Sequence, residues 1–498
     1  MPDPRIFLSK SRITAFEQCP RRLWLEVNRR DLIQYDAARR AVFQTGHEVG
    51  AIAQQLCPDG ILIGHDDQLS LALQQTSEQL FSRDRRPLFE ATFTYQDVLV
   101  RVDLLIPEAE GWRICEVKST GSVKSYHLAD LATQVWVTVG AGLTVSHASL
   151  QHIDTQFRYT QTGDYHGLFV EADRTQEIVA QVNTRHAVVE AAKATLRGPE
   201  PDIATGPHCA TPFDCPFLAH CGCDDPPPTD YPVDLLPNQG GKRAAMELKA
   251  AGYSDLRDVP TDVTLQGRLQ RILETTRSGV AYLDAAAIRE ELSGWAWPRY
   301  YFDFETVSFT VPRWLGTRPF ENLPFQFSCH VEQSDGTVSH HDFLDLSGED
   351  PSRACAEAIL STIGPVGAIV TYNASFERGC IRGLAQRHPD LAPRLHDIAD
   401  RIVDLLPVVR DHYYHRDMQG SFSIKAVLPA RLPELSYEAL DGVADGRAAQ
   451  DAYKEAVHEA TSPERQAELR RQLLDYCALD TWAMVRLAQS LSEGDATP

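Results

Sequence analysis

Hydrophobic runs interrupted at regular positions by polar residues predict two regions of mixed α/β structure along the chain. In the first region, short apolar segments are typical of strands, whereas longer segments space their apolar residues as a helix does. The expected strands are 87–95, 98–106, 112–118 and 147–153, and the expected helices are 37–56 and 125–142. The pattern therefore predicts an α/β domain with mixed sheets over residues 1–223.

A proline-rich, acidic stretch at 223–232 marks the end of this domain. Short helical patterns follow over 224–295. They predict either an interdomain helical linker or a helix-hairpin-helix, because Gly240-Gly241 resembles the glycine turn with which that motif binds phosphate. From 296 to 498, three strands lead into alternating helices and strands and then a mostly helical end. The expected strands are 299–306, 325–333, 338–346, 367–372 and 401–406.

Composition narrows the class of protein. The chain has 498 residues, 43% of them hydrophobic, which suits globular domains with sizeable cores. We find neither an apolar signal core nor an apolar run long enough for a membrane span, so we expect a cytoplasmic protein without a membrane partner. There, the 11 cysteines are expected to be metal ligands or core thiols rather than disulfides. A net charge of −21 argues against a surface coated with non-specific nucleic-acid contacts but permits a local basic groove.

Two carboxylates interrupt the apolar strand 299–306. Because successive side chains on a strand point to opposite faces, Phe302 and Phe304 should face one way and Asp303 and Glu305 the other. Two like charges side by side repel each other, and a bound cation is the simplest compensation. Two oxygen ligands on a rigid strand suit Mg²⁺ or Mn²⁺.

Later segments add to this pair of acids. Glu377 begins a predicted helix after strand 367–372, and Tyr476 and Asp480 lie four residues apart on one helical face. Four acids from separated segments suit two-metal phosphodiester hydrolysis, in which the ions activate water and stabilise the leaving oxygen. A phenol beside that water can orient it.

These motifs resemble those of the DEDDy exonuclease superfamily, which has an RNase H-like fold. The three motifs are Asp303-Phe-Glu305, Asn373-Ala-Ser-Phe376-Glu377 and Tyr476-Cys-Ala-Leu-Asp480. Glu377 departs from the family, which usually has Asp at this position. The resemblance covers roughly 296–490 and implies metal-binding and catalytic roles for these acids, with Asp404 as a supporting acid.

The first region carries a second set of acids. Asp103 lies in strand 98–106, and Glu116 and Lys118 share one face of the next strand, so a hairpin can join all three. Two carboxylates would bind a metal and the lysine would position or polarise the attacking water, or else the three are surface charges on a hairpin. The pattern resembles the PD-(D/E)XK nuclease superfamily. Its RecB-like branch implies a metal ligand at His47 and a role for Gln134, and Glu90 would approach from the neighbouring strand.

The cysteines are unevenly placed. Cys19 follows the first helix, and Cys209, Cys215, Cys221 and Cys223 cluster downstream. One distant cysteine plus three clustered ones resembles the iron–sulfur RecB-like nucleases, which implies a 4Fe-4S cluster held by Cys19, Cys209, Cys215 and Cys221. The alternative is Zn²⁺ held by the four downstream cysteines. The other six, Cys57, Cys115, Cys329, Cys355, Cys380 and Cys477, are expected to be core thiols.

Together the two halves resemble a bacterial family that fuses a RecB-like nuclease to a DEDD-type exonuclease module. We therefore expect a metal-dependent nuclease with two hydrolytic centres and nucleic acid as partner, with DNA favoured over RNA. One alternative is an RNA-processing 3′–5′ exonuclease. The other is a nucleic-acid-binding scaffold with one or both centres inactive.

Overall fold

The computed structural model describes residues 7–33, 37–64, 68–223, 229–437, 440 and 442–494. It divides the chain into two compact units. Unit 1 comprises Met1–Pro226 and Phe309–Phe320, and unit 2 comprises Pro227–Ser308 and Glu321–Pro498. The predicted mixed α/β class is confirmed for the described residues. Half of the proline-rich boundary predicted from the sequence, residues 224–228 of 223–232, lies outside the described residues.

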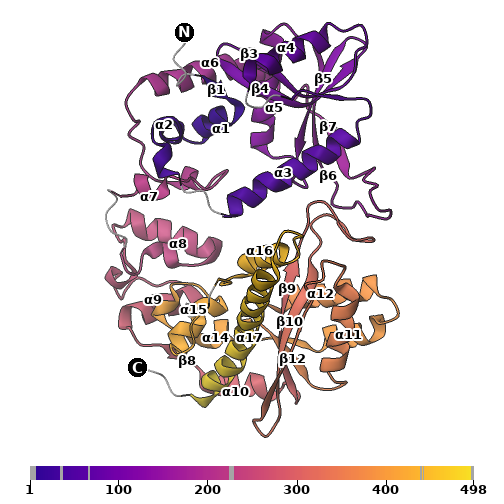
Figure 1. The fold of residues 1–498 in the computed structure, drawn as a ribbon. Coiled ribbons are helices and arrows are strands. Elements are labelled where there is room, and N and C mark those ends of the chain that lie inside the picture. The colour runs from indigo at the N-terminus through magenta and orange to yellow at the C-terminus, as the bar shows by residue number, and fades with distance from the viewer. Residues whose placement is uncertain are drawn as a thin grey trace. The chain divides into compact units, whose positions relative to one another are not determined.

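Unit 1 is built on one mixed sheet in the order β2-β3-β4-β5-β6-β7, with β1 paired to β4 (Figure 1). Its strands are β1 (Leu8–Ser9), β2 (Ile61–Leu62), β3 (Leu88–Tyr95), β4 (Val98–Glu108), β5 (Gly111–Lys118), β6 (Val145–Ile153) and β7 (Phe169–Asp173). Its helices are α1 (Lys10–Gln18), α2 (Pro20–Asn28), η1 (Arg30–Leu32), α3 (Ala37–Gln55), α4 (Leu69–Leu80), α5 (Ser125–Gly140), α6 (Val179–Arg197), η2 (Pro207–Cys209) and α7 (Leu218–Cys221). The four strands and two helices predicted for this region are confirmed.

Both faces of this sheet are covered. One face packs with α1, α2, α5 and α6 around buried residues such as Val102, Ile114 and Leu131. The other face packs with α3, where Ala53 contacts a cluster that contains Phe89, Leu104 and Cys115. Helices therefore cover both faces of strands β4 and β5.

Unit 2 contains a five-stranded sheet in the order β11-β10-β9-β12-β13 and a small pair, β14-β8. Its strands are β8 (Tyr282–Leu283), β9 (Arg299–Val307), β10 (Leu323–Glu332), β11 (Val338–Leu344), β12 (Ala368–Thr371), β13 (Ile402–Asp404) and β14 (Tyr413–Tyr414). Strand β10 is antiparallel to β9 and β11, whereas β12 is parallel to β9 and β13. The five strands predicted for this region are confirmed.

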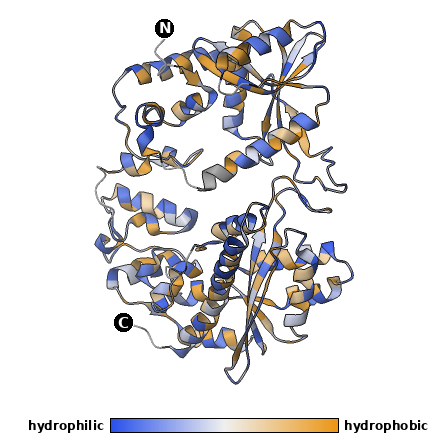
Figure 2. Cartoon of the chain, viewed as in Figure 1, coloured by the Kyte–Doolittle hydropathy of each residue, from blue (hydrophilic) through white to orange (hydrophobic). Residues whose placement is uncertain are grey.

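Helices cover this second sheet on both faces, and their ribbons alternate hydrophobic and hydrophilic residues (Figures 1 and 2). The helices of unit 2 are η3 (Val233–Leu235), α8 (Asn238–Ala250), η4 (Leu256–Asp258), α9 (Arg268–Ser278), α10 (Ala285–Ser293), α11 (Ser352–Thr362), α12 (Ala374–Arg387), α13 (Ala392–Asp400), α14 (Leu405–His412), η5 (Arg416–Met418), α15 (Ile424–Arg431), α16 (Gly446–Ala456) and α17 (Pro463–Glu493). Helices α11 to α13 pack on one face of the sheet and α17 on the other.

The helical segment between the two predicted domains packs into the core of unit 2. Leu236, Leu248 and Ile272 of this segment share a buried cluster with Val409 of α14 and Leu487 of α17. In the described part of the chain, no helix is both long and apolar enough to cross a membrane.

Candidate functional site

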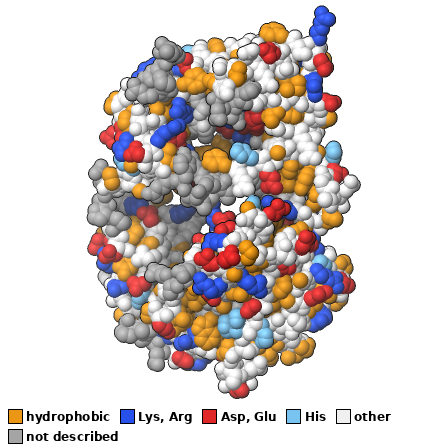
Figure 3. Space-filling view, viewed as in Figure 1, with side chains coloured by type: hydrophobic (Ala, Val, Ile, Leu, Met, Phe, Trp, Pro, Cys, Tyr) orange, Lys and Arg blue, Asp and Glu red, His pale blue; other side chains and the backbone are white. Residues whose placement is uncertain are grey.

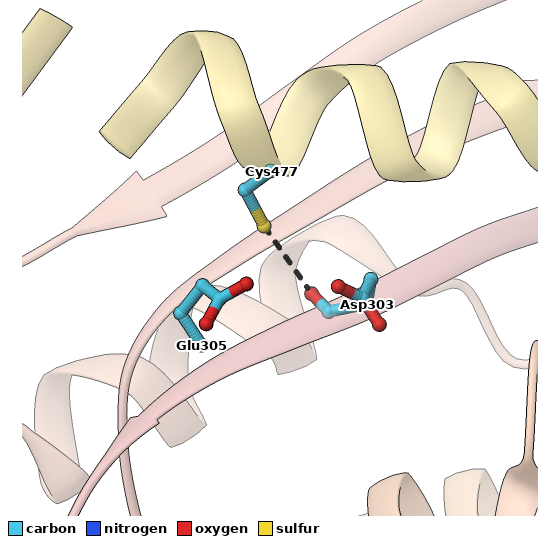
Figure 4. Close-up of side chains that lie close together, drawn as sticks. All are labelled: Asp303, Glu305 and Cys477. Carbon is cyan, nitrogen blue, oxygen red and sulfur yellow. Dashed lines mark hydrogen bonds between the residues drawn. The ribbon is translucent and has the colours of Figure 1, made fainter. Parts of the chain in front are cut away.

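Strand β9 places two acids on the face of the sheet that α17 covers. Phe302 and Phe304 are buried in the core with α11 to α13, as the alternation of the strand predicts. Asp303 and Glu305 therefore point the other way, toward α17. A ligand atom from each of them and the thiol of Cys477 all lie within 4.8 Å of one another (Figure 4). The Cys477 thiol donates to the Asp303 carbonyl oxygen at 3.9 Å, and burial raises its pKa well above the ordinary value, so it remains a neutral core thiol.

Two helices bring further acids to Asp303. Glu377 comes from the first turn of α12, which begins just after the end of β12, and Asp480 comes from the middle of α17. The charges of Asp480, Glu305 and Glu377 all act on Asp303, so the four acids form one group. We call this group, which consists of Asp303, Glu305, Glu377 and Asp480, the C-terminal acid cluster.

The C-terminal acid cluster carries more negative charge than its surroundings balance. Burial raises the pKa of Glu305 and that of Glu377 to about 8, with neighbouring carboxylates adding to the shift. Burial also raises the pKa of Asp480 to about 6, although hydrogen bonds from two tyrosines oppose the shift. The Oε2 atom of Glu377 is buried without a hydrogen-bond partner. A buried acceptor of this kind costs free energy unless a proton or a cation satisfies it.

Two tyrosines contact Asp480. Tyr476 lies one helical turn before it on α17, as predicted, and is 4% exposed. Tyr437, which the sequence did not single out, donates its hydroxyl to Asp480 Oδ1 at 2.5 Å. Burial and the charge of Asp480 raise the pKa of both phenols, so each keeps its proton. No local pattern in the sequence marked Tyr437, because it comes directly after the irregular residues 432–436 and not within a helix or strand of regular periodicity.

Asp404, predicted as a supporting acid, lies at the end of β13. Its carboxylate accepts backbone hydrogen bonds from Asn373 at 3.0 Å, Ala374 at 3.1 Å and Leu406 at 3.0 Å. It therefore caps the start of α12 and of α14 at the same time. Its charge also contributes to the raised pKa of Glu377. Through these bonds it positions the helix that carries Glu377.

The acids predicted in the first region line one cavity of about 650 Å³ in unit 1. The titratable residues that line it are Lys10, His47, Glu90, Asp103, Glu116 and Lys118. His47 is exposed on α3, and Asp103 Oδ2 accepts a hydrogen bond from the Val117 backbone N–H at 2.7 Å. Burial and then the charge of Glu116 raise the pKa of Asp103 to about 8. The structure thus brings the predicted hairpin residues together.

The backbone is distorted where Glu90 meets Asp103. Glu90 has φ +56°, a left-handed conformation that residues with side chains rarely adopt. The β3–β4 pairing places it opposite Asp103, between the pairs Phe89–Leu104 and Ala91–Val102. Strained backbone of this kind persists where the surrounding fold imposes it, and it is concentrated at functional sites.

Glu116 is held by two lysines and an amide. Lys10 Nζ donates to Glu116 Oε1 at 2.5 Å, and Lys118 Nζ donates to the same oxygen at 2.8 Å. Gln134, fully buried on α5, donates to the other oxygen. Burial would raise the pKa of Glu116, but the two ammonium groups outweigh it and lower the pKa. Sequence reasoning did not identify Lys10.

Asp130 was also missed, although its spacing offered a signal. It lies on α5 one helical turn before Gln134, so both face β5. Lys118 Nζ donates to Asp130 Oδ2 at 2.8 Å, and Thr14 donates to Oδ1 at 2.9 Å. Lys118 is therefore fixed between Glu116 and Asp130.

The four cysteines assigned from the sequence, Cys19, Cys209, Cys215 and Cys221, line one small cavity. Cys19 lies between α1 and α2, and the other three lie on η2, α7 and the loop between them. Gln18 ties the two segments together by donating to the carbonyl oxygens of His208 at 2.7 Å and Phe213 at 2.6 Å. Arg21 and Arg22 line the same cavity.

The charge environment couples these thiols. Burial raises the pKa of Cys215 and of Cys221, the charges of the other cysteines add to the rise, and an arginine opposes it in each case. The arginines would thus offset the charge of several thiolates held together. Cys223, which the zinc alternative would use, is exposed.

A family model matches part of the chain. Residues 300–423 match a family described as a domain of unknown function, DUF2779. The match begins in β9 and contains Asp303, Glu305, Glu377 and Asp404, but it ends before Tyr476 and Asp480. Searches of curated proteins and of solved structures find no match to the chain.

Proposed function

We propose that the protein is a metal-dependent nuclease with two phosphodiester-hydrolysing centres, and that DNA is favoured over RNA as its substrate. The observation that carries this proposal is the C-terminal acid cluster. Its acids come from β9, α12 and α17, and Glu305, Glu377 and Asp480 are 5%, 3% and 8% exposed. Acids buried this deeply and this close together require protons or cations.

The donors of the C-terminal acid cluster fit Mg²⁺ or Mn²⁺, which prefer carboxylate oxygens. The buried Glu377 Oε2 atom without a partner is the specific observation that supports a cation there. Asp303, Glu305, Glu377 and Asp480 would hold the metal, which when bound activates water and stabilises the leaving oxygen of a phosphodiester.

The residues of the chain have distinct roles around that reaction. Tyr476 keeps its hydroxyl proton because its pKa is raised, and a cation bound by Asp480 would replace its hydrogen bond to that acid, so the hydroxyl would be left to donate to the attacking water and orient it. Tyr437 donates its hydroxyl to Asp480 Oδ1 and so holds this carboxylate in place. Asp404 fixes the start of α12 and thereby the position of Glu377.

Sheet topology supports the two fold families implied by the sequence. In unit 2 the strand order β11-β10-β9-β12-β13, with β10 antiparallel to β9 and β12 parallel to it, is the arrangement of an RNase H-like domain. In unit 1 the β4–β5 hairpin that carries Asp103, Glu116 and Lys118, flanked by α3 and α5, supports a PD-(D/E)XK nuclease domain of the RecB-like type.

In the N-terminal centre, His47, Asp103 and Glu116 would hold the metal and Lys118 would position the attacking water. The raised pKa of Asp103 supports a cation there, because a cation would replace the proton that this acid otherwise keeps. Both oxygens of Glu116, however, already accept hydrogen bonds from Lys10, Lys118 or Gln134. This observation favours a second candidate function, in which the N-terminal centre binds nucleic acid and does not cleave it.

The cysteines fit a 4Fe-4S cluster of structural role. Cys19, Cys209, Cys215 and Cys221 would hold it, and the cluster would tie the start of unit 1 to the segment after α6. The shared cavity, with Cys19 among its lining residues and Cys223 exposed, supports this set over the zinc alternative. The cytoplasmic location expected from the sequence stays a prediction.

On the face drawn in Figure 3, Lys and Arg side chains lie among Asp and Glu side chains, and the chain as a whole has a net charge of −21. Nucleic-acid contacts would therefore be local to the two centres and not spread over this surface.

The test is a digestion assay with Mn²⁺ on labelled single- and double-stranded DNA and RNA. Asp303→Asn should abolish the activity of the C-terminal centre, and Lys118→Ala that of the N-terminal centre. Glu459→Gln, at an exposed glutamate, serves as the control that loses one acid without touching either centre. If the parent protein cleaves none of the substrates, or if Asp303→Asn cleaves all of them at the parent rate, the proposal fails.

A further inference from the structure

The start of α15 and the start of α16 both lie beside the C-terminal acid cluster. Lys425 in the first turn of α15 places its Nζ atom 5.1 Å from the ring centroid of Tyr476 and 5.4 Å from that of Tyr437. At the start of α16, a Cβ atom built on Gly446 would lie 3.7 Å from Glu305 Oε2. The starts of both helices therefore reach the acids or the tyrosines beside them.

Lys425 is the cation that α15 brings to the cluster. Its Nζ atom lies over the ring of Tyr437, whose hydroxyl donates to Asp480, and over the ring of Tyr476, one helical turn before Asp480, so its positive charge lies beside that acid. Its Nζ atom donates to the Ala444 carbonyl oxygen at 2.6 Å, which fastens the side chain to the start of α16. An ammonium group has three donors, and the Ala444 carbonyl is the one acceptor that the described residues show for it.

The two centres use their lysines differently. In unit 1, Lys10 and Lys118 donate directly to Glu116, at 2.5 and 2.8 Å, and so neutralise the carboxylate on which they lie. Lys425 instead rests over two aromatic rings while its charge acts on the acids. A lysine held beside an acid cluster in this way can bind an anion that enters the same site. A phosphate group is such an anion, because cations bound by the acids would attract it as well.

We propose that Lys425 is a substrate-binding residue of the C-terminal centre, and that it binds a phosphate group of the nucleic-acid strand beside the scissile bond. This inference rests on the proposed function, since it names the part of the substrate that the centre holds. The competing explanation is that Lys425 only fastens α15 to the Ala444 carbonyl oxygen. The two explanations differ in salt dependence, because only a phosphate contact releases counterions when nucleic acid binds.

The experiment uses the full chain with Lys118→Ala, so that cleavage reports on the C-terminal centre. Binding of a labelled single-stranded DNA is measured by fluorescence anisotropy, with Ca²⁺ in place of Mn²⁺, over a series of salt concentrations. Lys425→Gln should weaken binding about 10- to 100-fold, as expected for a lost charged hydrogen bond. It should also reduce the slope of log affinity against log salt by about 0.7. In Mn²⁺, KM should rise more than kcat falls.

Two further variants make the result specific. Glutamine can still donate to the Ala444 carbonyl, and Lys425→Arg keeps the charge and should keep the parent salt slope. Arg353→Gln removes one exposed positive charge from α11, on the opposite face of the sheet, and should change neither slope nor KM. Weaker binding by Lys425→Gln with the parent salt slope would mean that Lys425 only fastens α15 to Ala444, and would overturn the inference.

Failure of the inference and failure of the proposed function are distinguishable. If the Lys118→Ala protein cleaves and Lys425→Gln leaves affinity, slope and KM unchanged, the inference is wrong and the nuclease function stands. If that protein does not cleave, but Lys425→Gln still reduces the salt slope, the phosphate contact stands and hydrolysis at this centre is wrong. If it binds no nucleic acid at all, both are wrong.

Discussion

Replacing Glu305 by glutamine should stabilise the metal-free protein, and the gain should grow as the pH rises. Burial and the charge of Asp480 raise the pKa of Glu305 from its ordinary value of 4.5 to about 8. The folded state thus holds the proton more tightly than the unfolded state does. The contribution of this carboxyl to stability is complete below pH 4.5 and is lost as the pH rises toward 8. Glutamine has the same shape and stays neutral, so the variant escapes the loss.

The size of the effect follows from the two pKa values. Each pH unit between them costs about 1.4 kcal/mol, so the penalty of the carboxylate is about 1 kcal/mol at pH 5, about 3 at pH 7 and about 4 at pH 8. Glu305 is only 5% exposed, so solvent screens little of this penalty. In a unit of this size, each kcal/mol shifts the melting temperature by about 2 to 4 °C. The melting temperature of Glu305→Gln should therefore exceed that of the parent by a margin that is roughly 5 to 10 °C larger at pH 7 than at pH 5.

Differential scanning calorimetry in EDTA from pH 5 to pH 8 measures this difference directly. Glu459→Gln provides the matched control, because the same substitution at an exposed glutamate of unit 2 should track the parent at every pH. Mn²⁺ should stabilise the parent more than Glu305→Gln, since the parent alone offers this ligand. A melting difference between Glu305→Gln and the parent that stays constant across this pH range would refute the reasoning.

Three further changes test other parts of the molecule. Tyr476→Phe should keep the packing and the Mn²⁺ affinity of the parent. It should slow single-turnover cleavage roughly 10- to 1000-fold, because the transition state loses about 2–4 kcal/mol of hydrogen bonding. Cleavage at the parent rate would exclude the water-orienting role. Cys209→Ala, purified without oxygen, should lose the iron and brown colour of the parent, whereas stoichiometric zinc in the parent would contradict the cluster. Asp404→Ala should lower the free energy of unfolding by about 1–2 kcal/mol for each helix cap it removes, which thermal unfolding would measure. It should also weaken Mn²⁺ binding through Glu377, which calorimetric titration would measure. Unchanged Mn²⁺ affinity would contradict the positioning role of Asp404.

Local pattern in the sequence was enough to predict which face of β9 carries the acids. Alternation along a strand is a property of the backbone, so Phe302 and Phe304 had to enter the core once Asp303 and Glu305 faced the other way. Helical spacing likewise placed Tyr476 and Asp480 on one face of α17. Such inferences need only neighbouring residues, and the structure bears them out.

The partners of these acids were decided by the path of the chain. Lys10 and Glu116 are separated by 106 residues, and Tyr437 and Asp480 by 43, distances over which periodicity carries no information. Residues 309–320 belong to unit 1, although the residues before and after them belong to unit 2. Their contacts are with residues far away in the sequence, as when the Tyr165 hydroxyl donates to the Pro312 carbonyl oxygen.

The sequence by itself thus predicted nine of the twelve strands in the two large sheets, several of the helices, and residues with the chemistry to bind metal. The tertiary structure alone decided how the acids are compensated, namely by direct lysine contacts at Glu116 and by a ring-held lysine beside Glu305 and Asp480. The physical reason is that burial of a face is encoded in a few consecutive residues. Charge compensation, in contrast, depends on which distant segments the packing of the whole unit brings within a few ångströms.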